Sequence, residues 1–186
     1  MSNYRVAFRY GTALLQSAEE EHLLEQTARD AEMIAKTVRE NRDLRVFLAS
    51  PIIVKEKKKQ VLDGLFEKLV GQVMVRFLNL LTEKDREGQL LDILEEFLHL
   101  FDEKRGILRV EVTSAVDLTE KERDQLRSRL ESYTGKTVVP GFRRDPTLLG
   151  GFVVRLDDRV IDASLSHQLT LLKEKFLEES TVAKGS

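Results

Sequence analysis

Apolar residues recur every three or four positions through the first 105 residues of the chain, which is the spacing of amphipathic helices. Acidic, asparagine-containing and proline-containing breaks divide this stretch into six segments. The expected helices cover about 4–18, 19–39, 44–49, 54–66, 69–83 and 89–105. The first of them carries two apolar stripes rather than one. We therefore expect it to contact neighbours on more than one side.

The fifth segment, 69–83, is more apolar than a surface helix needs to be. Its apolar residues cover a wider arc than the roughly 100° stripe of a helix that packs on one side. They are Leu69, Val70, Val73, Met74, Phe77, Leu78, Leu80 and Leu81. This pattern favours a central helix of a bundle, and it is also typical of a helix that lines a groove for a partner helix. Both interpretations can hold together.

The period of the pattern changes at Gly106. Leu108, Val110 and Val112 alternate with polar residues, which is typical of a half-buried strand. The sequence therefore predicts a domain boundary at Arg105–Gly106. We expect one domain over 1–105, a second over 106–178, and a flexible tail over 179–186.

Local signals outline the first half of the second domain. Thr119 and Glu122 have the spacing of a capping box, so they predict the start of a helix. Gly135 is expected to end that helix. A strand follows over 137–144, where Pro140 indicates an edge strand or a bulge.

A glycine pair begins the second half of this domain. Gly150 and Gly151 can adopt positive φ or allow another segment to approach closely. The alternation over 152–156, a turn at 157–158 and a return over 159–161 predict a hairpin.

A last helix is expected to begin at Asp162 or Ser164. Its apolar residues are Leu165, Leu169, Leu172 and Phe176. The fold class predicted for the whole chain is α+β and mainly α. It consists of a six-helix bundle followed by a small α/β domain with a short mixed sheet and two helices.

Composition narrows the classes of function. Hydrophobic residues make up 41% and charged residues 33% of the chain, which predicts a soluble globular protein with a densely charged surface. The formal net charge of -2 argues against a strongly basic nucleic-acid-binding protein. Cysteine is absent, which excludes disulfides and thiol chemistry. The first residues, Met1–Arg5, lack the long apolar core of a signal peptide, so none is expected, and no run of roughly 18 apolar residues predicts a transmembrane helix. We expect membrane association only through a partner.

Motifs for catalysis, cofactors or metals are not found. Gly135–Thr137 resembles the end of a phosphate-binding loop, but Leu130 stands where the first glycine of that loop belongs. His22, His99 and His167 are far apart and have no neighbours at metal-ligand spacing. We therefore predict no catalytic residue, no cofactor and no metal, and we expect a binding role.

A basic run over 55–59 begins the fourth predicted helix. It is interpreted as a solvated face opposite four residues that are expected to face inward, Val54, Val61, Leu62 and Leu65. The alternative is contact with an acidic partner or with anionic lipid headgroups. Nucleic acid is disfavoured because no aromatic residues interleave with the lysines.

Eight short motifs, in this order and spacing, carry a resemblance that covers about Tyr4 to Leu177. They are Ala7–Leu14, Phe47–Pro51 with Lys55, Phe77–Glu83 with Arg86, Val110–Leu118, Thr134–Lys136, Asp145–Gly151, Val160–Ser164 and Leu169. Together they resemble the delta subunit of F-type ATP synthase, the bacterial counterpart of the mitochondrial oligomycin-sensitivity-conferring protein. Two positions depart from the usual pattern. Gly11 replaces an alanine, and Glu87 replaces an apolar residue between the fifth and sixth helices.

The resemblance implies a non-catalytic stator subunit. Such a protein links the catalytic head to the peripheral stalk, so that the head resists rotor torque during proton-coupled ATP synthesis. The implied partners are the N-terminal helix of an alpha subunit and the b subunits of the stalk. The implied location is the cytoplasmic face of the bacterial plasma membrane, as a peripheral part of the synthase. A helical adaptor unrelated to the synthase is the alternative function.

The resemblance also suggests where the partners bind. It implies that the alpha helix lies in a groove between the first and fifth helices. The residues expected there are Tyr10, Ala13, Leu14, Phe77, Leu80 and Leu81. The stalk is expected to contact the sheet and last helix of the second domain. The residues expected for that contact are Phe152, Val154, Leu169 and Leu172, each of which could instead belong to the core of the domain.

Overall fold

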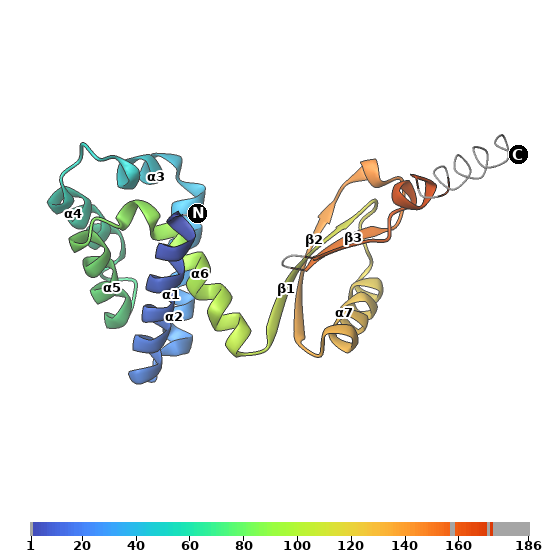
Figure 1. Cartoon of the computed structure of the whole chain (residues 1–186), viewed down its shortest axis with the longest axis horizontal. Helices are drawn as coiled ribbons and strands as arrows, with labels where there is room; N and C mark the ends of the chain where they lie inside the picture. Colours follow the sequence, from blue (N-terminus) through green and yellow to red (C-terminus); the bar gives the residue numbers. More distant parts are fainter. Residues whose placement is uncertain (1, 157–158, 171, 173–186) are drawn as a thin grey trace, which may run out of the picture. The chain divides into compact units, whose positions relative to one another are not determined.

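The computed structural model describes residues 2–156, 159–170 and 172 of the chain. The chain divides into two compact units, Met1–Arg105 and Gly106–Ser186 (Figure 1). The expected flexible tail over 179–186 and Phe176 of the last helix lie outside the described residues.

The described residues of the first unit form helices joined by turns and short loops, with no strand among them. Asn41 separates two of the helices, and its side-chain Oδ1 accepts a hydrogen bond of 3.0 Å from the Leu44 N–H. His22 and Asp85 have positive φ in the turns after the first and fifth helices. The elements are α1 (Ser2–Glu20), α2 (Leu24–Glu40), α3 (Arg42–Ala49), α4 (Lys55–Phe66), α5 (Gln72–Glu83), the short 3₁₀ helix η1 (Glu87–Gln89) and α6 (Leu90–Lys104).

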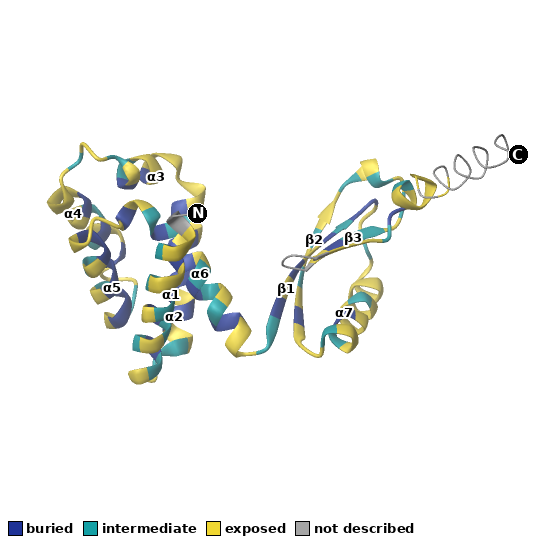
Figure 2. Cartoon of the chain, in the orientation of Figure 1, coloured by how far each residue is buried: buried dark blue, intermediate teal, exposed yellow. Residues whose placement is uncertain are grey.

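Helix α6 is central to the core of this unit because it packs against both α1 and α2. Ile93, Leu94 and Phe97 of α6 are fully buried. Figure 2 shows that the buried residues lie along the inner sides of the helices. Gly11 of α1 meets α6 where a Cβ atom would lie only 3.0 Å from the backbone nitrogen of Phe97. A glycine at this position therefore lets the two helix backbones approach closely.

Ion pairs tie the end of α1 and the start of α2 to the C-terminal end of α6. Glu19 pairs with Lys104, and Glu25 pairs with Arg105 at 2.7 Å. Arg105 also lies over the ring of Phe101, 5.6 Å from its centroid. The end of α6 is therefore held by several contacts just before the backbone enters the second unit.

The second unit has a mixed four-stranded sheet in the order β2-β1-β3-β4. Strand β1 is parallel to β2, whereas β1 and β3, and β3 and β4, are antiparallel. Val112 and Val154 are fully buried, and Leu130 from α7 packs with them. The elements are β1 (Ile107–Ser114), α7 (Glu120–Thr134), β2 (Thr137–Arg144), the 3₁₀ helix η2 (Pro146–Leu148), β3 (Phe152–Leu156), β4 (Arg159–Asp162) and a helical stretch over 165–170.

These elements confirm the predicted class, which is mainly helical with a small mixed sheet. Pro140 does lie in an edge strand, and the one-to-one register of β1 and β2 excludes a bulge there. Thr119 and Glu122 form the predicted capping box, and hydrogen bonds from Thr119 hold the pKa of the Glu122 carboxyl below its ordinary value. Ser164 caps the last helix, since its Oγ accepts a hydrogen bond from the His167 N–H.

The glycine pair before β3 packs closely against the segment that leads into the last helix. Gly151 has a φ of 74°, and a Cβ atom there would lie 2.2 Å from the carbonyl oxygen of Ala163. A Cβ atom on Gly150 would lie 2.5 Å from Cδ1 of Leu165. The backbone is further joined by hydrogen bonds from Ala163 N–H to Phe152 and from Leu165 N–H to Gly150. The two glycines therefore fix where the last helix begins relative to the sheet.

We predict that Gly151→Ala destabilises the second unit by more than about 1 kcal/mol, because backbone strain at positive φ adds to a clash with backbone atoms. The matched control is Gly141→Ala in β2, where the nearest atom to a new Cβ is 3.8 Å away. Urea unfolding followed by the methyl NMR signals of Val112 and Val154 reports on this unit. A midpoint for Gly151→Ala equal to that of the control contradicts the prediction.

Candidate functional site

The polar groups of the described residues offer little for catalysis. No group of three or more His, Asp or Glu side chains among them is placed to hold a metal ion. His22, His99 and His167 are all exposed and lie on different elements. No helix in the described part of the chain is both long enough and apolar enough to cross a membrane.

Helices α1 and α5 pack against each other, which brings together the elements expected to form a groove. The six expected residues divide into two groups. Leu14, Phe77 and Leu81 belong to the core, with exposed fractions of 1%, 6% and 0%. Tyr10 is half-buried, whereas Ala13 and Leu80 are exposed, Leu80 by 39%. Only the second group can touch a partner without rearrangement of the core.

Two aromatic residues of α1 were missed by the sequence interpretation. Tyr4 and Phe8 are exposed by 63% and 45%, and their ring centroids are 6.2 Å apart. Their spacing of four residues on the first helix was a usable signal, but it belongs to neither of the two apolar stripes that were considered. An exposed aromatic pair on a helix is typical of a binding surface.

An open pocket of about 600 Å³ runs along the outward side of α1. The surface that lines the pocket is mostly apolar, and two arginines are among the lining residues. The residues that line it are Tyr4, Arg5, Phe8, Arg9, Thr12, Ala13 and Gln16. Among the described residues, the Thr12 hydroxyl oxygen is buried without a hydrogen-bond partner. We call this pocket, together with Tyr10 and Leu80, the α1 surface.

The four residues expected to contact the stalk also divide. Val154 is fully buried and lies opposite Val112 of β1 and Ile161 of β4, so its role is in the core. Phe152 is half-buried and packs against the same core. Leu169 and Leu172, by contrast, are 57% and 50% exposed.

Leu165 extends this exposed set on the last helix. It is 48% exposed, and the three leucines have the i, i+4, i+7 spacing of one helix face. We call Leu165, Leu169 and Leu172 the leucine stripe. Three large apolar side chains exposed on one helix face are typical of a surface that binds another helix.

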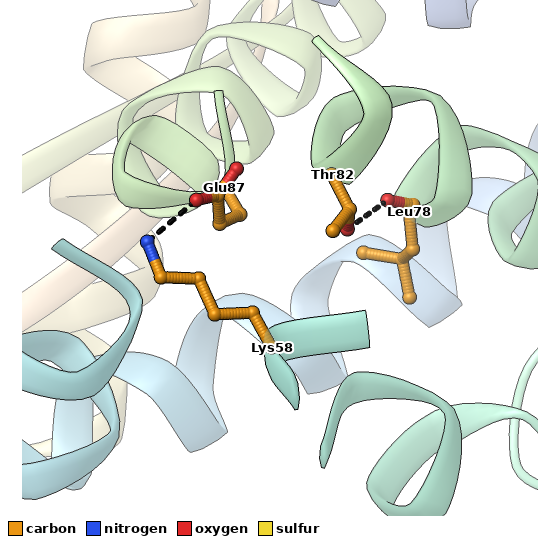
Figure 3. A network of polar contacts seen from close by, with 4 residues as sticks. All are labelled: Lys58, Leu78, Thr82 and Glu87. Carbon is orange, nitrogen blue, oxygen red and sulfur yellow. Dashed lines mark hydrogen bonds and ion pairs between the residues drawn. The ribbon is translucent and has the colours of Figure 1, made fainter. Parts of the chain in front are cut away.

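The basic run of α4 is only partly a solvated face. Lys55, Lys57 and Lys59 are exposed, but Lys58 is 5% exposed, so the sequence interpretation is wrong for this residue. Its Nζ donates a hydrogen bond of 2.6 Å to Oε1 of Glu87, which is equally buried. Figure 3 shows this pair beside Thr82, whose hydroxyl donates to the carbonyl oxygen of Leu78.

The Lys58–Glu87 pair explains why an acidic residue is tolerated after α5. A carboxylate buried without a counter-charge would cost several kcal/mol, and the Lys58 ammonium provides that counter-charge. The pair joins α4 to η1, which are distant in the sequence. Its role is therefore structural.

Comparisons with known proteins agree with one another. The family model described as ATP synthase delta (OSCP) subunit matches residues 6–176. The protein named ATP synthase subunit delta from Chlorobium phaeovibrioides is 40% identical over 177 residues, which cover 95% of this chain and 98% of that protein. The protein of the same name from Salinibacter ruber is 38% identical over 186 residues, which cover 100% of this chain and 97% of that protein.

A solved structure shows the same fold at lower sequence identity. A chain in the structure of the Toxoplasma gondii mitochondrial ATP synthase hexamer superposes with a TM-score of 0.74 and is 19% identical. The match covers 92% of this chain and 97% of that chain.

We predict that Lys58→Met destabilises the first unit by about 3–5 kcal/mol, because it leaves the Glu87 carboxylate buried without its partner. The double variant Lys58→Met/Glu87→Leu should regain most of that loss. Lys59→Met, at the exposed neighbouring position, is the matched control and should change stability by less than about 0.5 kcal/mol. Urea unfolding followed by circular dichroism measures all three. Equal stability of Lys58→Met and the control would contradict the prediction.

Proposed function

The chain belongs to the ATP synthase delta (OSCP) subunit family, and we propose that its two units bind two different partners in the synthase. As a member of this family it is a non-catalytic stator subunit of F-type ATP synthase. Its mechanism is then the free energy of binding that opposes torque, with no covalent bond made or broken. The one observation that carries the two-partner proposal is that each unit exposes its own apolar surface, the α1 surface and the leucine stripe.

The first unit is proposed to act as a six-helix bundle that binds the N-terminal helix of an alpha subunit. That helix lies along α1 and reaches α5 at Leu80. Apolar anchors at helical spacing on the partner fit between Tyr10 and Ala13 of α1 and Leu80 of α5, as in other complexes of a helix in a groove. Leu14, Phe77 and Leu81 support the surface from beneath and do not touch the partner.

Charge favours an amphipathic partner with acidic residues beside its apolar face. Arg5 and Arg9 line the pocket next to Phe8, so they can pair with carboxylates at the edge of a docked helix. Such contacts orient the helix, while apolar burial supplies most of the affinity.

The second unit is proposed to bind the b subunits of the peripheral stalk through the leucine stripe. Leu169 and Leu172 from the expected set contact the stalk directly, with Leu165 in addition. Val154 and Phe152 build the sheet on which the last helix rests. Membrane association then follows only through the assembled complex, at the cytoplasmic face of the bacterial plasma membrane.

A helical adaptor that is unrelated to the synthase is not supported, because family membership covers nearly the whole chain. The adaptor and the stator nevertheless make different predictions for a peptide of the alpha N-terminus. Only the stator is expected to bind it.

We predict that the full chain binds a peptide from a cognate alpha N-terminus with one-to-one stoichiometry, and that Leu80→Asp weakens this binding at least tenfold. A charge placed in the groove loses apolar burial and must be desolvated when the peptide binds. Isothermal titration calorimetry measures both affinities.

The matched control for this experiment is Leu65→Asp on α4, where the leucine is exposed to a similar degree. It should bind the peptide as the unchanged chain does. Equal affinity of the Leu80→Asp and Leu65→Asp variants, with both folded by circular dichroism, rules out the α1–α5 groove as the site.

We further predict that Leu169→Asp abolishes binding of a C-terminal segment of the b subunits and leaves binding of the alpha peptide unchanged. The substitution removes the middle leucine of the stripe. Gln168→Asp, at the exposed neighbouring position, introduces the same charge and should bind both partners. Pull-down and calorimetry with each partner distinguish the two sites. Retained stalk binding by Leu169→Asp contradicts the assignment of the leucine stripe.

A further inference from the structure

Strand β2 lies at an edge of the sheet and, within the part of the chain that the structure describes, pairs with β1 alone. Its eight residues make it as long as β1. The outer side of such a strand carries backbone N–H and C=O groups that can pair with another chain, so a long edge strand is a template for association. The backbone groups on that side of β2 decide whether the edge is open.

The orientation of each N–H group of β2 follows from two hydrogen bonds at its ends. Thr137 N–H donates to Gly106 at 2.9 Å, and Asp145 N–H donates to Ser114 at 2.8 Å. The register between β1 and β2 is continuous, so odd-numbered residues direct their N–H groups toward β1. Because successive residues of a strand alternate, the N–H groups at even positions face outward.

Two of the four outward positions cannot donate to another strand. Val138 N–H already donates to the carboxylate of Glu131, at 3.1 Å from Oε1. Pro140 has no N–H group at all. Glu131 lies in the last turn of α7, and its own carbonyl accepts a bond of 2.8 Å from Gly135 N–H, which ends the helix beside β2.

We propose that the β2 edge is a latent pairing surface for β2 of a second copy of this chain, and that Glu131 and Pro140 keep it closed. A second copy is the natural occupant because a strand edge can face its own copy across a two-fold axis. Antiparallel pairing centred on the strand sets Val138 opposite Arg144 and Pro140 opposite Phe142. In each of these pairs, one of the two backbone hydrogen bonds between the strands cannot form, because the N–H group of Val138 is occupied and Pro140 has none.

Charge at the far end of the strand adds to this protection. Arg143 and Arg144 are both exposed, and Arg144 lies 3.6 Å from Asp117 of its own chain. Phe142 lies under the guanidinium of Arg123, 4.9 Å from the ring centroid. The side chains next to the two remaining outward donors are therefore engaged within the same unit. This inference is independent of the proposed function, because it concerns a different surface.

The test is the double variant Glu131→Ala/Pro140→Val in the full chain. It restores both outward donors, so self-association should tighten at least tenfold relative to the unchanged chain. Sedimentation equilibrium over a range of concentrations measures this. The matched control Glu120→Ala removes an exposed carboxylate at the other end of α7 and leaves both the Glu131 cap and Pro140 in place, so it should associate as the unchanged chain does.

Hydrogen exchange locates the contact and provides a measurement that does not depend on the double variant. In the unchanged chain, the Val138 amide should exchange more slowly than the Phe142 amide, and Glu131→Ala should remove that difference. In the associated double variant, both amides should become protected. A folded double variant that associates no more tightly than the control overturns the proposal, and so does a Val138 amide that Glu131→Ala leaves unchanged.

Discussion

The close approach of α1 to α6 is the constraint on which the first unit depends. Gly11 permits it, because a side chain there would meet the backbone of Phe97. One side of α1 is thereby committed to the core, through Ala7, Leu14 and Ala18. Tyr4 and Phe8 lie on a flank of α1 beside this buried side and remain exposed. The core and the exposed aromatic pair thus use different sides of the same helix.

The sequence predicted the class of the fold because its signals are local. The change from helical to alternating periodicity at Gly106, the capping box at Thr119 and the edge position of Pro140 are each set by residues close together in the chain. It could not predict that Lys58 is buried, because its partner Glu87 comes from a distant element and the lysines beside it are exposed. The role of Gly11 could not be predicted for the same reason, since its neighbour Phe97 is remote in sequence.

The candidate sites were predicted only at the level of elements. The resemblance directed attention to the first and fifth helices, yet three of the six residues proposed there are in the core. A hydrophobic residue on a two-sided helix carries no signal of which side meets solvent. Tyr4 and Phe8 are the opposite case, because they are exposed although the sequence did not single them out. Their exposure depends on which part of α1 the neighbouring helices leave uncovered. Val154 and Leu169 likewise look alike in the sequence as apolar residues, but Val154 is buried in the core of the sheet and Leu169 is exposed on the last helix.

The held end of α6 has a mechanical consequence. If partners pull on the two units in opposite directions, the tension passes through the backbone between Lys104 and Ile107. Gly106, with a φ of 64°, lies in that short span. The pairs of Lys104 with Glu19 and of Arg105 with Glu25 spread the pull to the α1–α2 turn before α6 unwinds. Raised salt, which screens exposed ion pairs, should therefore lower the force at which this helix end frays.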